Sequence, residues 1–177
     1  MIVLIVAHDQ NRGIGLNNQI PWFVPGELKW VAETTTRTTK TNSTNALVMG
    51  RRTWESIPET RRPLKNRLNV VISRSMIPNP YTEDSQPEPF VYSNLPEALD
   101  RLKEQPNIEN IFIFGGGMIY REALDNDWID QILVTEIPGI YEADTQFPPI
   151  PEHFHATTTS ETLYGDQQVR RTTYQRT

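Results

Sequence analysis

Cysteine is absent from this sequence, which excludes a disulfide framework and a thiolate metal site. Histidine is scarce as well. Of the three present, His153 and His155 have a spacing that can hold a metal on a strand, but no carboxylate pair accompanies them. No Ser/His/Asp or Cys/His constellation stands out that would indicate nucleophilic catalysis. We therefore predict no metal site.

Long apolar runs are missing too. The longest, from Ile2 to Ala7, is far too short to cross a bilayer, which takes about 20 apolar residues. The chain also begins without the basic lead-in and the small-residue cleavage pattern of a secretory signal. We expect a protein of the cytoplasm that does not enter a membrane.

A net positive charge is also missing, because 17 Lys and Arg stand against 22 Asp and Glu, for a net charge of −5. A chain of this charge is not expected to bind nucleic-acid backbones. Its cations are nevertheless concentrated in one stretch: Arg51, Arg52, Arg61, Arg62, Lys65, Arg67 and Arg74. This stretch is either a solvated basic surface or the binding site of a discrete anion.

What the chain does have is the composition of a globular protein: 177 residues, 37% of them hydrophobic, and a mean hydropathy of −0.53. No repeat and no shift in composition divides it, so we expect one domain over residues 1–177. Two polar stretches, Thr34–Asn45 and Ile77–Pro89, are expected to be surface loops inserted outside the core. No long apolar surface stripe remains once a core is assigned, which favours a monomer.

Apolar runs and helical periodicity alternate along the rest of the chain. Strands are predicted at Ile2–His8, Ala46–Met49, Leu68–Ser73, Asn110–Phe114, Gln131–Ile137 and Gln167–Tyr174. Helices are predicted from Pro25, over Arg52–Ile57, over Asn94–Gln105 with Ser93 as N-cap, and after Gly117. This alternation predicts an α/β fold whose mostly parallel sheet is closed by an antiparallel C-terminal strand.

The strongest local motif is a buried strand that runs into Gly115, Gly116 and Gly117 and then into a helix. Glycines at such a turn clear space for an approaching phosphate and adopt conformations that other residues avoid. The N–H groups of the following helix would attract an anion. The spacing is not G-x-G-x-x-G, so the motif does not require that fold. A tight turn that binds no ligand is the alternative.

A second junction of strand and helix carries charge, in the sequence Gly50-Arg51-Arg52-Thr53, and Ser73-Arg74 ends the next predicted strand. Arginine is the usual companion of the 2′-phosphate of NADP. Because the ends of adjacent parallel strands meet at one edge of a sheet, these residues predict nucleotide binding there.

Glu27 follows an apolar and aromatic stretch and precedes Leu28, Trp30 and Val31. It is either a first-turn glutamate that the helix dipole favours, or a carboxylate that faces the sheet. In the second case it is suited to binding a protonated heterocycle or to relaying a proton.

Taken together, these residues resemble the dihydrofolate reductase family along nearly the whole chain. The matching pieces, in order, are Ile14-Gly15, Pro21-Trp22, Glu27, residues 48–57, Arg62-Pro63-Leu64, Arg67, Ser73-Arg74, Gly115–Tyr120, Thr135, and Asp144-Thr145 before Phe147-Pro148. Their order and spacing are specific, and the resemblance is weakest across residues 77–108 and after residue 151. It implies one domain with about eight strands, mostly parallel, and about four flanking helices.

The resemblance also implies an enzyme that uses NADPH to reduce 7,8-dihydrofolate to 5,6,7,8-tetrahydrofolate for one-carbon metabolism, and that antifolates inhibit. Glu27 would accept hydrogen bonds from the 2-amino group and the N3 side of the pteridine, Thr135 would support Glu27, and Trp22 would hold a water. Arg67 would bind the α-carboxylate of the glutamate tail. The other substrate contacts implied are Ile5, Leu28, Val31, Ile57, Arg62 and Leu64.

For NADPH, the resemblance implies that Ala7, Ile14 and Phe114 face the nicotinamide. The rest of the cofactor site would comprise Gly15, Leu16, Asn18, Gly50, Arg51, Arg52, Thr53, Ser73, Arg74, Gly115, Gly116, Gly117, Met118, Ile119 and Tyr120. A cis peptide is expected between Gly115 and Gly116. Residues Asp9–Phe23 are expected to act as a lid, with Gly13 and Gly15 easing its motion. Water would deliver the proton to N5, and Glu27 would tune the site.

Two positions depart from the family pattern. Val31 stands where the family usually has Phe, so its contact with the aminobenzoyl ring should be thinner, and Met118 stands where some members have Arg. Two other functions stay open. A riboflavin-pathway NADPH reductase of the same fold would not need Glu27 and Arg67 in these places, and a catalytically inactive module would bind the nucleotide without turnover.

Overall fold

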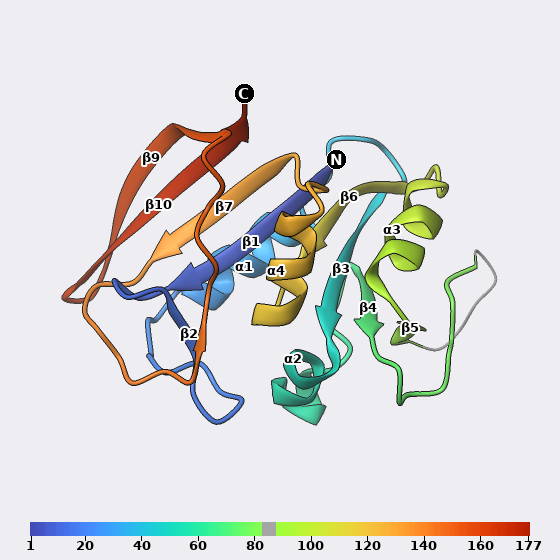
Figure 1. Ribbon diagram of the computed structural model, residues 1–177, viewed down its shortest axis with the longest axis horizontal. Coiled ribbons are helices and arrows are strands. Elements are labelled where there is room, and N and C mark those ends of the chain that lie inside the picture. The colour runs from blue at the N-terminus through green and yellow to red at the C-terminus, as the bar shows by residue number, and fades with distance from the viewer. Residues whose placement is uncertain (83–87) are drawn as a thin grey trace.

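The computed structural model describes residues 1–82 and 88–177, and within them eight strands form one sheet (Figure 1). The strands are β1 (Ile2–His8), β3 (Thr44–Gly50), β4 (Leu68–Ile72), β5 (Phe90–Tyr92), β6 (Ile108–Ile113), β7 (Gln131–Glu136), β9 (Phe154–Tyr164) and β10 (Gln167–Arg176). Their order is β5-β4-β3-β6-β1-β7-β10-β9. The pairings from β5 to β7 are parallel, and β10 pairs antiparallel with both β7 and β9. The predicted α/β fold with a mostly parallel sheet is confirmed.

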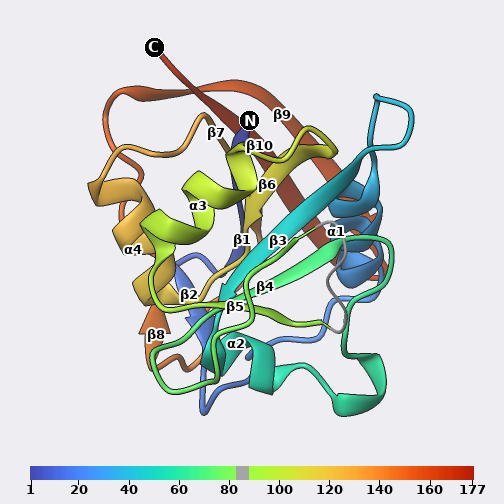
Figure 2. The same cartoon turned by 90° about the vertical axis from the view of Figure 1, so that its right-hand side faces the viewer.

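Helices cover both faces of this sheet. They are α1 (Glu27–Thr36), α2 (Arg51–Ser56), α3 (Leu95–Lys103) and α4 (Gly117–Asp125), with a 3₁₀ turn at Glu59–Arg61. Figure 2 shows α1 on one face and α3 and α4 on the other, with α2 at the ends of β3 and β4. A second, short sheet pairs β2 (Gly13–Gly15) with β8 (Thr145–Gln146). No helix in the described part of the chain is long and apolar enough to span a membrane.

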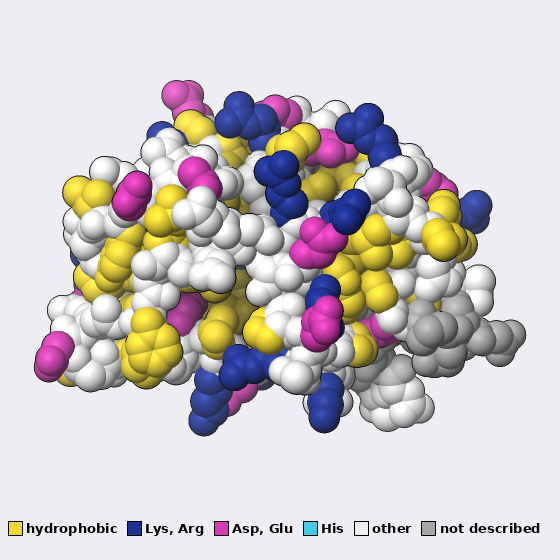
Figure 3. Space-filling model, turned by 90° about the horizontal axis from the view of Figure 1, so that it is seen from below, with side chains coloured by type: hydrophobic (Ala, Val, Ile, Leu, Met, Phe, Trp, Pro, Cys, Tyr) yellow, Lys and Arg dark blue, Asp and Glu magenta, His cyan; other side chains and the backbone are white. Residues whose placement is uncertain are grey.

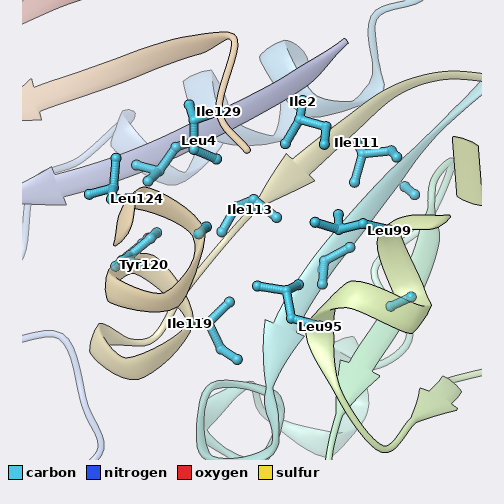
Figure 4. Packing of buried hydrophobic residues seen from close by; sticks show 14 of the residues in the cluster. Ile2, Leu4, Leu95, Leu99, Ile111, Ile113, Ile119, Tyr120, Leu124 and Ile129 are labelled. Atoms are coloured by element: carbon cyan, nitrogen blue, oxygen red, sulfur yellow. The ribbon is translucent and has the colours of Figure 1, made fainter. Parts of the chain in front are cut away.

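The core lies in two layers because alternate residues of each central strand point to opposite faces. Leu4 of β1 belongs to the layer under α3 and α4, where it joins Leu99 and Tyr120 (Figure 4). Its neighbours Val3 and Ile5 belong to the layer on the other face. Burial on both sides explains why β1 reads as a continuous apolar run and not as an alternating one.

Two predicted helix starts were wrong. Helix α1 begins at Glu27 and not at Pro25, because Gly26 has a φ of 90°, which a right-handed helix does not contain. Helix α3 begins at Leu95 with Asn94, not Ser93, as its N-cap. The side-chain Oδ1 of Asn94 accepts a hydrogen bond of 2.9 Å from the backbone N–H of Glu97.

The polar stretch at residues 34–45 is only partly the external loop that was predicted. Helix α1 continues to Thr36, and β3 begins at Thr44. Thr35 and Asn45 are buried, and the Nδ2 of Asn45 donates to the carbonyl oxygens of Thr35 and Arg37. Polar side chains can be buried here because the backbone at the end of α1 supplies their hydrogen-bond partners.

The second polar stretch, residues 77–89, is likewise not wholly outside the core. Asn79 forms a bridge with Val91 of β5, and Tyr81 packs edge-on against Phe90 at 5.0 Å between ring centroids. Residues 83–87 of that predicted loop lie outside the described residues. Strands β5 and β9 were not predicted. Strand β5 has only three residues, and β9 is largely exposed, so its sequence shows no buried run.

Candidate active site

Three neighbouring strands place a row of side chains on the face of the sheet that α1 covers. Ala7 of β1 lies in register with Thr135 of β7, and Thr135 lies in register with Arg171 of β10. In-register neighbours present their side chains to the same face. Glu27, the first residue of α1, reaches this row, because its carboxylate contacts Arg171. The side chain of Glu27 is therefore turned inward, and the residue is only 5% exposed.

Arg171 and Glu27 form a buried ion pair. The Nη2 of Arg171 lies 2.5 Å from the Oε2 of Glu27, and both side chains are less than a tenth exposed. Nη2 also donates to the Tyr164 hydroxyl at 3.0 Å, and Nη1 donates to the Thr162 hydroxyl at 3.1 Å. The guanidinium lies over the Trp30 ring, 4.3 Å from its centroid. Sequence reasoning missed Arg171. The sequence offered one indication: Arg171 lies two residues after Val169 in a predicted strand, so the two side chains share a face, and Val169 is buried.

Thr135 does not bond Glu27 in this structure, contrary to the expectation. The Oγ1 of Thr135 and the Oε1 of Glu27 are both buried and without a hydrogen-bond partner among residues 1–82 and 88–177. Arg171 holds the other oxygen of the carboxylate instead. Buried polar atoms are rarely left unpaired. The free oxygens of Glu27 and Thr135 therefore suit a ligand that donates hydrogen bonds.

Most of the predicted apolar wall comes together. Ile5, Val31, Ile57 and Leu64 belong to one cluster, which also contains Phe114. Leu28 does not join it, because this residue of α1 is 60% exposed. Trp22 packs in a different cluster with Ala7, and its ring meets Tyr141 edge-on at 5.8 Å between centroids.

Arg67 is half-buried, and burial lowers the pKa of its guanidinium. Its Nη1 donates to the hydroxyl of Thr35, and its Nε is buried without a partner in the described chain. This leaves the arginine able to bind a further acceptor. Arg62 is held differently. Its Nη1 donates to the carbonyl oxygen of Trp54 at 3.4 Å, and its guanidinium lies over the Trp54 ring.

The two strand–helix junctions that the sequence singled out lie side by side at the ends of β3 and β6. The backbone N–H of Gly50 donates to the carbonyl oxygen of Gly115 at 2.7 Å. The peptide between Gly115 and Gly116 is cis, as expected. Gly115 has a φ of 107°, and a Cβ on Gly117 would lie 3.0 Å from the Cγ2 of Thr145. These glycines are therefore required both by backbone conformation and by close packing.

Comparison with known proteins agrees with this geometry. A sequence model of the family described as dihydrofolate reductase matches residues 1–176. This chain belongs to the dihydrofolate reductase family. The dihydrofolate reductase of Drosophila melanogaster is 39% identical over 151 residues, which cover 85% of this chain and 81% of that protein. That of Aedes albopictus is 36% identical over 168 residues, 93% of this chain and 88% of that protein.

A longer relative matches through part of its length. The bifunctional dihydrofolate reductase-thymidylate synthase of Glycine max is 41% identical over 150 residues, which cover 83% of this chain but 28% of that protein.

The family uses NADPH, and the residues at the two glycine junctions fit it. Helices α2 and α4 begin after Gly50 and Gly116, which have no side chain to cap the first N–H groups. Arg52 and Arg74 are exposed at the same edge, while Arg51 is bound to Glu55 at 2.6 Å. Figure 3, seen from below, shows basic side chains on this side of the molecule, interspersed with apolar and some acidic ones. Cationic groups beside uncapped helix starts suit phosphates.

Other predicted cofactor residues differ in what they can offer. Ile119 and Tyr120 lie in the core, where the Tyr120 hydroxyl donates to the carbonyl oxygen of Ile5 at 2.8 Å and burial strongly raises the Tyr120 pKa. Their side chains are thus committed to packing, and their backbone is what they can present to a ligand. Met118 is exposed. The Ser73 hydroxyl accepts a bond of 3.1 Å from the N–H of Met76, which closes the turn that contains Arg74.

The predicted lid contains a tight turn. The N–H of Leu16 and the carbonyl oxygen of Gln19 bond at 2.9 Å, with Asn17 and Asn18 at positive φ between them. The N–H of Asn17 donates to the carboxylate of Asp144 at 2.8 Å, which holds this segment to the loop before β8. Ile14 packs against the core layer of α3 and α4, and Gly15 pairs with Thr145. Motion of this segment stays a prediction.

A cavity of about 220 Å³ lies elsewhere, where β1 and β6 begin. Its lining includes Ile2, Glu109, Trp128 and Asp130, and none of the predicted site residues is among the described residues that line it. The face of the sheet that α1 covers is the better candidate, because Glu27 in the first turn of α1, Thr135 of β7, and Arg67 beside the last turn of α1 each carry a buried polar atom without a partner in the described chain.

Proposed function

We propose that Glu27, Arg67 and the residues around them carry out in this chain the reaction of its family. That reaction is the NADPH-dependent reduction of 7,8-dihydrofolate to 5,6,7,8-tetrahydrofolate. As a member of the dihydrofolate reductase family, the chain is an NADPH-dependent oxidoreductase of folate metabolism.

The observation that carries the residue assignment is the buried carboxylate of Glu27 with one unpaired oxygen. A carboxylate accepts hydrogen bonds only, and its two oxygens match the two donors on the 2-amino group and the N3 side of a pteridine, because Oε2 has a lone pair besides the one that Arg171 uses. The unpaired hydroxyl of Thr135 can serve the same amino group. Together they would fix the orientation of the heterocycle.

Arg67 would bind the α-carboxylate of the substrate's glutamate tail. It lies half-buried beside the cluster of Val31, Ile57 and Leu64, with its Nε unpaired within residues 1–82 and 88–177. A planar guanidinium with a free Nε and Nη edge matches the two oxygens of a carboxylate. The apolar cluster between Arg67 and Glu27 would then cover the middle of the substrate.

Bound NADPH would supply the hydride that goes to C6 of the pteridine. Gly50, Thr53, Gly115–Gly117 and the basic residues Arg52 and Arg74 would hold its phosphates, with Ile14, Ala7 and Phe114 near its nicotinamide. The proton for N5 would come from water, because the ionisable side chain nearest to the pteridine would be Glu27, which is committed to the N3 side. Glu27 would thus act by orienting the pteridine and through the electrostatic effect of its negative charge on the site.

The direct test is to mix the protein with NADPH and dihydrofolate and to follow the loss of NADPH absorbance. We expect oxidation that depends on dihydrofolate and that antifolates block. Binding of NADPH without oxidation would indicate the inactive nucleotide-binding module instead. Turnover only with a pyrimidine precursor of riboflavin would indicate the other reductase. A cytoplasmic location and a monomeric state are further proposals, which fractionation and light scattering would test.

A further inference from the structure

Arg171 occupies a position in the site that the reaction as proposed does not use. It comes from β10, near the C-terminus, 144 residues from Glu27 in sequence, and its Nη2 lies 2.5 Å from Glu27 Oε2. The residue is 8% exposed. Arg170, its neighbour on the same strand, is exposed and pairs with Glu161 at 3.4 Å. Adjacent residues of a strand point to opposite faces, so the two arginines have different surroundings.

The side chains around Arg171 restrict its movement. Tyr164 and Thr162 of β9 accept hydrogen bonds from Nη2 and Nη1, and the indole of Trp30 lies 4.3 Å from the guanidinium carbon. Trp30 belongs to α1, the helix that Glu27 begins. The guanidinium is therefore held by β9 on one side and by α1 on the other, and it approaches Glu27 from one direction only.

The two oxygens of the Glu27 carboxylate consequently differ. Oε2 accepts from Arg171, whereas Oε1 is buried and has no partner in the part of the chain that the structure describes. A carboxylate bonded at one oxygen to a fixed cation cannot rotate without losing that bond. The pairing leaves Oε1 wholly free for a ligand and leaves Oε2 one lone pair besides the one that Arg171 uses.

We propose that Arg171 is a positioning residue for dihydrofolate reduction, which fixes the orientation of the Glu27 carboxylate through Oε2 so that the carboxylate receives the pteridine. This inference rests on the proposed function of Glu27. It assigns a role in the site to the C-terminal hairpin of β9 and β10. Lysine cannot reproduce the role, because one ammonium lacks the forked geometry that reaches Glu27, Tyr164 and Thr162 together.

The test is a double-mutant cycle on kcat/KM for dihydrofolate, with Arg171→Leu, Glu27→Gln and the variant that combines them. We expect Arg171→Leu to lower kcat/KM by roughly 10- to 100-fold, the range expected when a hydrogen bond to a charged group is lost. The dissociation constant for NADPH should stay within about twofold of wild type, since Arg171 touches no predicted cofactor residue. In the Glu27→Gln background, Arg171→Leu should change kcat/KM by less than about threefold.

Arg170→Leu is the matched control and should leave kcat/KM unchanged. If Arg171→Leu does not fold, Arg171→Lys can replace it in the double-mutant cycle, both with Glu27 present and with Glu27→Gln. This substitution keeps the positive charge and the aliphatic stem of the side chain. We expect Arg171→Lys to lower kcat/KM when Glu27 is present and to have little effect when it is absent. Equal losses in both backgrounds, or a lowered Tm with kcat/KM unchanged, would overturn the inference.

The same assays separate this inference from the proposal on which it rests. A wild-type protein that does not oxidise NADPH with dihydrofolate would overturn both. An active wild-type protein in which the effects of Arg171 and Glu27 substitutions simply multiply would overturn the role of Arg171 alone.

Discussion

The Nη1 of Arg67 donates a hydrogen bond to the hydroxyl of Thr35, a buried residue in the last turn of α1. The Thr35 hydroxyl in turn donates to the carbonyl oxygen of Val31 at 2.7 Å. Thr35 thus connects the guanidinium to the backbone of the helix that begins with Glu27. The polar stretch that looked like an external insertion contributes directly to the proposed site for the substrate tail.

Arg67→Lys should weaken binding of dihydrofolate about 10- to 100-fold, because a lysine cannot make the bidentate pair with the tail carboxylate, and hydrogen bonds to charged groups are worth about 1.5–3 kcal/mol. Binding is measured by titration in the absence of NADPH. Dihydropteroate, which lacks the glutamate, should bind both proteins equally. Arg61→Lys, at an exposed position in the same stretch, is the control. An equal loss for both ligands would place the effect outside tail recognition.

Glu27→Gln should slow reduction at neutral pH by about 10²- to 10⁴-fold, because the amide removes the negative charge and offers one acceptor oxygen in place of two. The measurement is kcat from NADPH absorbance across a range of pH. Glu33→Gln, on an exposed position of the same helix, should leave kcat unchanged. A rate and pH profile equal to those of wild type would remove Glu27 from the chemistry.

Glu109 should make stability depend on pH in acid. Its carboxylate accepts hydrogen bonds from the backbone N–H groups of Lys40 and Thr39, each at 2.9 Å. These two bonds are the main reason that the pKa of Glu109 falls from 4.5 to about 2. A carboxyl whose pKa is lower in the folded state stabilises the fold above its unfolded pKa, and this contribution is lost as pH falls through the folded value. The relevant window is thus about pH 4.5 to 2.

The comparison that isolates Glu109 is wild type against Glu109→Gln, by thermal unfolding at several pH values. We expect wild type to have the higher Tm at pH 5, with the difference shrinking toward pH 2. A difference in Tm that is constant over this range would show that the carboxylate bonds to residues 39 and 40 do not stabilise the folded protein.

Gly13→Ala should destabilise the fold by about 1–3 kcal/mol, since an added Cβ would lie 2.8 Å from the Cβ of Ala143, and overpacking costs this much. Gly15→Ala is the matched substitution in the same short strand. Its Cβ would meet no other atom closer than 3.7 Å. Thermal unfolding should show a Tm lowered by several degrees for the first variant and a small change for the second. Equal shifts would mean that conformational freedom, and not packing, makes glycine necessary at residue 13.

Much of the central sheet could be predicted because its strands are buried on both faces. The strands β1, β3 and β4 are mostly apolar, with runs such as Ala46–Met49, and this pattern can be recognised without knowing which strands pair. Strand β9 could not be found in this way. It lies at the edge of the sheet with most of its residues exposed, and its place depends on pairing with β10.

Similarly, the sequence predicts which residue types bind but not which of them meet. Glu27 and Arg67 were identified by their resemblance to a family pattern, and Glu27 is buried as that resemblance requires. The partner of Glu27 could not be predicted. Thr135 was expected beside it, whereas Arg171 is the group bonded to it.

By itself, then, the sequence determined the α/β class, the alternating elements, the glycine turn between β6 and α4, and the family. These depend on local periodicity, on backbone permissiveness and on motif order, which are properties of short segments. Only the tertiary structure decided that Arg171 holds Glu27 and that Thr35 holds Arg67. Both contacts join segments far apart in the chain, and a contact of that kind depends on strand register and helix placement, which no local pattern records.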